Sequence, residues 1–442
     1  MTSMTLGQSQ KLRDAVRGLM PLAEDIFNKV RAASQDDVGV TRAAWSIQDQ
    51  AAADILLAAA RNHGLTTRQD AIGNTYATLN GMNETAPGIL TGSHLDSVAK
   101  GGNFDGLAGA VAGVIALAAM KKAGLQPGCK LSAMGTRCEE SVWFGIAYIG
   151  ARLAVGDMGR AAFDALMRLD SGQTISAHMS ELGIVADDIW HHDHVEITAA
   201  NTKAFLELHI EQGPLLVEQN VPLGIATAVR GNLRFGDGIC FGAYQHSAAT
   251  PRRLRQDTVL AVTELLQRLE TLWHDIEDNV DPSAVFTVGK IFTDPSHHAL
   301  TKVPGECHFS LNFGSTEQSS QDRFEAAIAD LTAEIGARRR VRFVMGAPVG
   351  SSPTPLNPTL RSSLVQSAER LDIPCTEFAT VGHDASIFAR AGIPAAVLLV
   401  RNNDGSHNPD EKMAMADFEQ GVQVLAATMI ELSNTKNNAE VI

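Results

Sequence analysis

Short apolar segments alternate with helical segments through the first half of the chain, and this alternation limits the fold more than any other feature. Strand character appears at residues 74–79, 88–91, 131–134 and 205–209. Helical spacing of apolar residues covers 12–26 and 46–63, and the small apolar stretch 106–123 predicts a buried helix. Parallel strands need crossover connections, which are usually helices. The sequence therefore predicts an α/β domain with a mixed, mostly parallel sheet and helices on both faces.

The middle of the chain predicts a second, smaller domain. Strand patterns lie at residues 234–243, 284–292 and 306–313, and helical patterns lie at 255–273 and 316–337. This order suits an α+β sandwich. Beyond Pro353 a helical pattern at 358–370 and an apolar strand at 395–400 resume the first arrangement. We therefore expect residues 1–214 and 348–442 to form one domain, and residues 215–347 to form an inserted one.

Histidine and carboxylate residues follow several of the predicted strands. His94 and Asp96 are two residues apart, so they face the same side of a strand, and Asp105 lies in a glycine-rich turn. A lone His-x-Asp is more often a satisfied histidine in a loop than a metal ligand. Further candidates follow other strands: Glu139, Glu140, His209 and His407. Open α/β sheets place their sites at the carboxyl ends of strands, so we expect these side chains to converge.

A convergent set of this kind suits two divalent metal ions. Adjacent carboxylates such as Glu139 and Glu140 repel unless a cation or a shared proton offsets them. Two ions about 3.5–4 Å apart can activate a water and polarise a carbonyl. Imidazole and carboxylate ligands fit zinc best, and they also accept manganese, cobalt or nickel. Asp96 is expected to hold the second ring nitrogen of His94.

Five segments resemble the metal-dependent amidohydrolases of the peptidase M20 family. They are GSHLDSVAKGGNFDG, the pair EE at 139–140, FLELHIEQGP, GHDA at 382–385 and GSHNPDE. The resemblance extends from about Arg42 to Glu411. It is closest to the branch of N-carbamoyl-L-amino acid hydrolases, β-ureidopropionases and allantoate amidohydrolases. It implies a catalytic domain interrupted by a lid or dimerisation domain, and a homodimer that forms through this lid.

The resemblance also implies roles for individual residues. His94 and His209 would bind one metal, Glu140 and His407 would bind the other, and Asp105 would bridge the two. Glu139 would be the general base, and His246 of the lid would act across the dimer to stabilise the oxyanion. The substrate would contact Gln212 and the segment of His383 and Asp384.

The lid departs from the family where amino-acid substrates are held. The family's lid asparagine and arginine, which hold a substrate carboxylate, correspond here to Thr301 and Gly314. Glycine offers no charge, so either the substrate lacks that carboxylate or another cation replaces the arginine. Candidates for the replacement are Arg401, Arg234 and Lys302. Arg401 follows the strand at 395–400 and precedes His407, although an ordinary surface arginine is at least as common.

Composition excludes several partners. The net charge of −14, without a basic block, argues against nucleic acid and membrane surfaces, and leaves a small-molecule substrate. Five scattered cysteines predict no disulfide framework, and residues 1–14 lack a signal-peptide pattern, so we expect a cytoplasmic protein. The run His191-His192-Asp193-His194 is more typical of a surface loop than of a metal site.

Three functions remain in competition. The first is hydrolysis of a linear amide or ureido bond, with an N-carbamoyl compound as the preferred substrate. The second is a broader amidase, aminoacylase or dipeptidase activity of the same superfamily. The third is a catalytically silent binding protein, whose only support is the altered lid. Retention of Glu139, of all five expected ligands and of His246 argues against the third function.

Overall fold

The computed structural model describes residues 4–191 and 195–435, so most of the histidine-rich run at 191–194 lies outside the described residues. The chain divides into two compact units. The first unit comprises Met1–Thr227 and Leu356–Ile442, and the second unit is Ala228–Pro355.

These bounds differ from the expected insertion at 215–347. Strand β6 (Leu223–Val229) pairs with β17 (Ala395–Val400), which ties residues just after 215 to the first sheet. At the other end, β14 (Val349–Ser351) pairs with β7 (Gly231–Phe241) and so extends the second unit beyond 347.

The first unit is built on a nine-stranded sheet in the order β1-β2-β4-β3-β5-β17-β6-β15, with β16 beside β6. The central strands β4, β3, β5 and β17 are parallel, whereas β1, β2, β6 and β15 pair antiparallel. The mixed, mostly parallel sheet is thus confirmed. The remaining bounds are β1 (Thr66–Gln69), β2 (Thr75–Leu79), β3 (Gly88–His94), β4 (Leu131–Thr136), β5 (Thr202–Ile210), β15 (Thr354–Pro355) and β16 (Cys375–Thr380).

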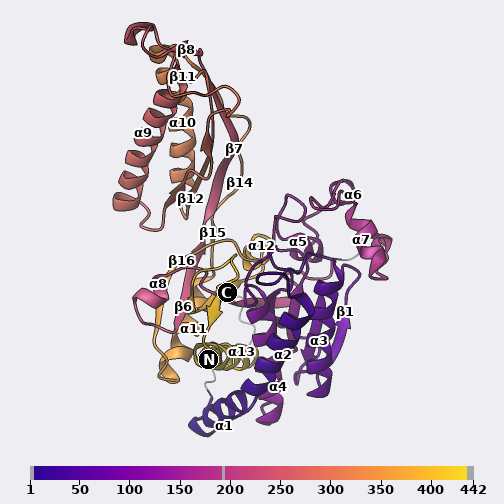
Figure 1. The fold of residues 1–442 in the computed structure, drawn as a ribbon. Helices are drawn as coiled ribbons and strands as arrows, with labels where there is room; N and C mark the ends of the chain where they lie inside the picture. The colour runs from indigo at the N-terminus through magenta and orange to yellow at the C-terminus, as the bar shows by residue number, and fades with distance from the viewer. Residues whose placement is uncertain (1–3, 192–194, 436–442) are drawn as a thin grey trace. The chain divides into compact units, whose positions relative to one another are not determined.

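Helices cover both faces of this sheet. On one face lies the buried helix α4 (Leu107–Lys122), and Leu206 and Leu208 of β5 share a core with it. On the other face Phe205 of β5 stacks on Phe388 of α12 (Ala385–Arg390), with ring centroids 4.0 Å apart. Figure 1 shows α2, α3 and α4 side by side. The other helices are α1 (Leu6–Arg17), α2 (Met20–Ser34), α3 (Ile47–Asn62), α5 (Ile149–Ala154), α6 (Arg160–Asp164), α7 (Ile175–Glu181), α8 (Leu215–Glu218), α11 (Pro358–Arg370) and α13 (Met415–Ser433), with a 3₁₀ turn at Ala186–Trp190.

The second unit is the expected α+β sandwich. Its sheet has the order β10-β12-β7-β13, with β14 beside β7 and β9 beside β12. Residues of β7 alternate between buried and more exposed, and the buried face packs under α9 and α10, which lie side by side (Figure 1). A separate ribbon joins β8 to β11. The bounds are β8 (Gln245–His246), α9 (Thr258–Asn279), β9 (Val285–Thr287), β10 (Ile291–Phe292), β11 (Lys302–Val303), β12 (Glu306–Ser315), α10 (Gln318–Arg339) and β13 (Arg342–Val344), with a 3₁₀ turn at Arg252–Leu254.

One expected helix start is confirmed, and two expectations need correction. Ser46 caps α3 by accepting a hydrogen bond from the Asp49 amide. The helical pattern at 12–26 is not one helix, because the chain turns between α1 and α2, and Pro21 lies in the first turn of the second helix. The strand expected at 284–292 is two short strands, β9 and β10. Among the described residues, no helix is both long and apolar enough to cross a membrane.

Candidate active site

The carboxyl ends of adjacent parallel strands bring two histidines together. His94 is the last residue of β3, and His209 is the last but one of β5, its neighbour in the sheet. Their Nε2 atoms lie 3.5 Å apart. Both are buried. A side chain on Gly106, whose φ is +66°, would collide with the His94 ring, so only glycine lets the following turn pass this close.

Asp105 lies between these histidines and faces both. Its Oδ1 is 3.3 Å from His94 Nε2 and 3.2 Å from His209 Nε2. The Nδ1 atoms of the two rings lie 3.0 Å and 2.9 Å from the backbone carbonyls of Asp96 and Ile210. A carbonyl can only accept, so Nδ1 of each ring carries a proton and Nε2 is the atom that faces Asp105. This orientation is the one a metal-binding imidazole needs.

A second cluster shares the same aspartate. His407 Nε2 lies 3.3 Å from Asp105 Oδ2 and 3.2 Å from Glu140 Oε1. These two carboxylates raise the pKa of His407 to about 10. Burial alone would raise the pKa of Asp105, but the imidazoles around it hold that pKa well below its usual range. The surroundings therefore favour positive charge beside Asp105 and Glu140.

The two clusters fit divalent cations. Asp105 Oδ1 and Glu140 Oε1 are buried oxygens that have no hydrogen-bond partner among the described residues. Buried carboxylate oxygens normally have partners, and coordination of a metal is one way to supply them. The donor atoms are imidazole nitrogens and carboxylate oxygens, a set that accepts zinc and similar ions. The five expected ligands are thus brought together, with Asp105 common to both groups.

Asp96 connects the His94 strand to the paired glutamates. Its carboxylate accepts hydrogen bonds from the Glu139 amide at 3.0 Å and the Glu140 amide at 3.2 Å. Its Oδ1 also lies 3.5 Å from His94 Nδ1, so the expected contact with His94 is present, and the contacts to the glutamate backbone add to it. Cys138, just before the pair, has a φ of +56°, an unfavourable conformation for a non-glycine residue. The chain is thus held in a strained turn that presents both glutamates.

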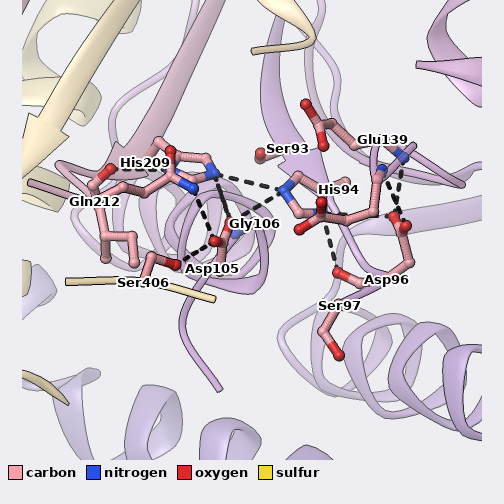
Figure 2. Close-up of polar contacts among 12 residues, drawn as sticks. Ser93, His94, Asp96, Ser97, Asp105, Gly106, Glu139, His209, Gln212 and Ser406 are labelled. Atoms are coloured by element: carbon pink, nitrogen blue, oxygen red, sulfur yellow. Dashed lines mark hydrogen bonds and ion pairs between the residues drawn. The ribbon is translucent and has the colours of Figure 1, made fainter. Parts of the chain in front are cut away.

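Glu139 lies beside the cluster without belonging to the Asp105 groups. A carboxylate oxygen of Glu139 is within 4.8 Å of ligand atoms of His94 and Glu140. Burial raises the pKa of Glu139 well above its usual range, His94 opposes this shift, and Glu140 adds to it. A carboxylate with a raised pKa is suited to take up and release a proton near neutral pH. Figure 2 shows Glu139 next to His94 and Asp96, with Asp105 and His209 on the other side.

The segment after β16 packs against the first cluster. The His383 ring is tilted against the His209 ring at 4.5 Å, and burial lowers the pKa of His383 well below its usual value. Asp384 accepts a hydrogen bond from Thr136, and burial raises the pKa of Asp384 to about 7. His383 is therefore neutral and supports the His209 ring. The contact of Asp384 with Thr136, the last residue of β4, could not be predicted from the motif that contains Asp384.

Three side chains at the site were not predicted. Glu207, two residues before His209 on β5, accepts hydrogen bonds from Ser93 Oγ at 2.6 Å and from the Ala385 amide at 2.8 Å. Its position on β5, two residues from an expected ligand, was the signal that could have found it. Ser406 Oγ lies within hydrogen-bond distance of the carboxylates of Asp105 and Glu411, and its single proton can be donated to either one.

Glu411 completes this support. Its Oε1 accepts from the amides of Phe104 at 2.7 Å and Asp105 at 3.2 Å. Gln212, whose φ is +64°, donates from Nε2 to Asp105 Oδ2 at 2.8 Å, while its buried Oε1 has no partner among the described residues. Figure 2 shows Gln212 and Ser406 converging on Asp105.

Arg401 does not offer its guanidinium to this site. Its Nε and Nη2 make a bidentate pair with Asp417 at 2.8 Å and 3.1 Å, and its Nη1 donates to Asn220 at 2.9 Å. These contacts use the guanidinium nitrogens that would otherwise bind a substrate carboxylate. The expectation of a substrate contact from Arg401 is therefore corrected: it joins β17 to α13.

His246 lies in the second unit, on the β8–β11 ribbon. Its Nδ1 accepts from the amides of Ala248 and Ala249, both at 3.2 Å, so Nε2 carries the proton and is the free donor. Its side chain is exposed, and Lys302 is its cross-strand partner. Lys302 Nζ rests 4.7 Å from the centre of the Tyr244 ring.

A mixed parallel sheet that presents two such clusters, with an adjacent carboxylate of raised pKa, defines a metal-dependent hydrolase. The chain belongs to peptidase family M20/M25/M40, whose model matches residues 90–431. It is 28% identical over 411 residues to the N-carbamoyl-L-amino-acid amidohydrolase of Paenarthrobacter aurescens, covering 92% of this chain and 97% of that one. It is also 28% identical over 403 residues to the allantoate amidohydrolase of Bacillus subtilis (strain 168), covering 90% and 93%.

Solved structures share the fold. An amidase of the hydantoinase/carbamoylase family from Burkholderia multivorans aligns with a TM-score of 0.86 at 24% identity, covering 94% of this chain and 98% of that one. Aminopeptidase PepT from Bacillus cereus aligns with a TM-score of 0.63 at 13% identity. Both likenesses concern the fold.

Proposed function

We propose that this protein hydrolyses a linear amide or ureido bond of a small molecule, with an N-carbamoyl compound as the preferred class. The observation that carries the proposal is the position of Glu139, a proton-transfer group beside ligand atoms of His94 and Glu140. Relatives that match nearly the whole chain are named N-carbamoyl-L-amino-acid and allantoate amidohydrolases, and both names describe cleavage of a linear C–N bond.

Two divalent cations, with zinc as the preferred ion, would be held by His94, His209 and Asp105 on one side and by Asp105, Glu140 and His407 on the other. Such ions lower the pKa of a water and polarise a carbonyl. Ser406, Glu411 and Gln212 orient the shared aspartate by the hydrogen bonds given above. Residues of this kind are as necessary to a metal site as its ligands.

Glu139 moves the proton. It takes a proton from the attacking water on a carboxylate oxygen while the water oxygen bonds to the carbonyl carbon. It then gives this proton to the leaving nitrogen as the C–N bond breaks, so that the carboxylate is restored. Asp96 keeps Glu139 in place through its backbone amide. Gln212 Oε1, a buried acceptor without a partner among the described residues, suits an N–H of the substrate.

The second unit contributes His246 in this proposal. Because Nδ1 accepts two amides, Nε2–H is the donor that a developing oxyanion requires. We propose a homodimer formed through the second unit, in which His246 acts on the site of the partner, and a cytoplasmic location.

The lid has Gly314 where the family has an arginine that holds the substrate carboxylate, and another arginine lies close to this position. Gly314 lies in β12, and a side chain there would begin 3.9 Å from Cδ of Arg230. Arg230 Nε donates to the Ser283 carbonyl at 2.7 Å, and its terminal nitrogens have no partner among the described residues. Asp281, the nearby carboxylate, already accepts from Ser283, Ser315 and Thr316. Arg230 is half-buried and makes no ion pair among the described residues, and Asp281 attracts it only at longer range. Its terminal nitrogens can therefore receive an anion, and Arg230 is our candidate for the substrate carboxylate.

A substrate panel tests the proposal. The protein is loaded with Zn²⁺ or Mn²⁺ and offered N-carbamoyl, N-formyl and N-acetyl amino acids and dipeptides. Release of ammonia and CO2 with the free amine identifies ureido cleavage, whereas N-acetyl or dipeptide turnover alone supports the broader amidase or dipeptidase. Glu139→Ala is the control. Failure of the loaded protein to turn over any panel member, with metal bound, would instead support the silent binding protein.

A further inference from the structure

Tyr148 is a phenol next to the general base that the mechanism above does not use. It follows the loop after the paired glutamates and is the N-cap residue of α5. Its amide donates to the Glu139 carbonyl at 3.0 Å, and the next two amides donate to the carbonyls of Cys138 and Arg137. The backbone of Tyr148 is therefore tied to the strand end that presents Glu139.

The backbone of Tyr148 is also strained. Its φ of +64° and ψ of +28° place it in the left-handed region, which is rare for an aromatic residue. Glycine or asparagine would adopt this conformation with less strain, but the position holds a tyrosine. Such a conformation persists only when the surroundings impose it, and residues that adopt it are concentrated at functional sites.

The side chain points across to the segment before α12. A Cβ added to Gly382 would collide with Tyr148 Oη, so glycine at 382 makes room for the phenol. Helices α5 and α12 are in contact, which holds the two segments together. The described residues provide no hydrogen-bond partner for Oη. Burial raises the pKa of Tyr148 well above its usual value, and Glu139 and Asp384 raise it further, so the phenol stays protonated.

A protonated phenol with a free O–H is a donor that needs an acceptor. A linear amide or ureido group has N–H donors and a single carbonyl acceptor. We propose that Tyr148 Oη donates a hydrogen bond to the carbonyl oxygen of the scissile bond and is a catalytic residue of the same subunit as Glu139. This inference rests on the proposed function. Because negative charge grows on that oxygen during attack, the bond strengthens in the transition state and acts mainly on kcat.

Tyr148→Phe tests the inference with little change of shape. We expect kcat/KM for the best panel substrate to fall about 10- to 100-fold, mostly in kcat, with metal content and Tm unchanged. The loss should be the same from pH 6 to 9, since the phenol is neutral throughout. Tyr76→Phe is the matched control: Tyr76 Oη donates to Asp70 at 3.0 Å, away from the catalytic groups, so its loss should lower Tm and leave kcat/KM unchanged.

A second variant separates catalysis from packing. Gly382→Ala should displace the phenol and lower kcat, whereas in the Tyr148→Phe background it should cause little further loss, because the collision with Oη is gone. Additive losses would overturn the inference, as would wild-type kcat/KM in Tyr148→Phe, or a loss that follows metal content or Tm. Inactivity of the wild-type protein on every substrate would instead contradict the proposed function.

Discussion

Replacement of Asp96 by asparagine tests how the site is assembled. The Asp96 carboxylate accepts two hydrogen bonds, from the amides of Glu139 and Glu140 at 3.0 Å and 3.2 Å, and both of its oxygens are used. Asparagine retains one acceptor, so one amide must face an NH2 donor. Loss of one hydrogen bond to a charged group costs about 1.5–3 kcal/mol, which corresponds to roughly 10- to 150-fold in an equilibrium constant.

We expect this energy to appear at the site, because the displaced amide belongs either to Glu139, the proposed general base, or to Glu140, a proposed metal ligand. The Asp96→Asn variant should bind metal about 10- to 100-fold more weakly in a competition titration with a chromogenic chelator. With saturating metal, its kcat should still be reduced, because Glu139 is displaced. Asp157→Asn, at an exposed ion pair with Arg152, is the matched control. Metal affinity and kcat within twofold of wild type would refute the reasoning.

The remaining predictions concern the base, the clamp and the core. Glu139→Gln should lower kcat by about 10²–10⁴-fold with metal retained. Because burial raises the pKa of Glu139, the acidic limb of the wild-type kcat/KM profile should lie above the usual pKa range of glutamate. An acidic limb near pH 4 would contradict this. Arg230→Ala should raise KM for carboxylated substrates and spare their uncharged amides, whereas Arg268→Ala, at an exposed ion pair with Glu334 in the same unit, should do neither. Equal KM changes for both substrate types would exclude Arg230 as the clamp. Asp49→Ala should reduce the free energy of unfolding, measured in urea, by about 3–5 kcal/mol, because it leaves the buried Arg137 without its ion-pair partner at 2.6 Å. A loss below about 1 kcal/mol would show that the ion pair is solvated.

The sequence predicts the sheet and the convergence of the clusters for the same physical reason. His94 follows one short apolar segment with strand character and His209 ends another, and the carboxyl ends of parallel strands lie at one edge of the sheet. The turn that carries Asp105 is short and glycine-rich, so it cannot leave that edge. Convergence at the site therefore follows from local patterns and strand direction.

Other features depend on contacts that no local pattern encodes. Arg401 is close to His407 in sequence, yet its direction is set by Asp417 on α13. The hydrogen bond from the Asp105 amide to Glu411 could be predicted only if the path of the loop after β17 were known. The bounds of the second unit depend on the pairing of β6 with β17, and the sequence patterns identified neither this strand nor the sheet that it joins.

The central claim is that two divalent ions share Asp105, and metal stoichiometry of Asp105→Asn tests it most directly. Wild-type protein freed of metal and titrated with Zn²⁺ should bind two ions per chain by calorimetry and elemental analysis. Because Asp105 faces His94 and His209 with one oxygen and His407 with the other, the variant should lose tight binding at both positions. A variant that retains one ion at wild-type affinity, or a wild-type protein that binds none, would contradict the account.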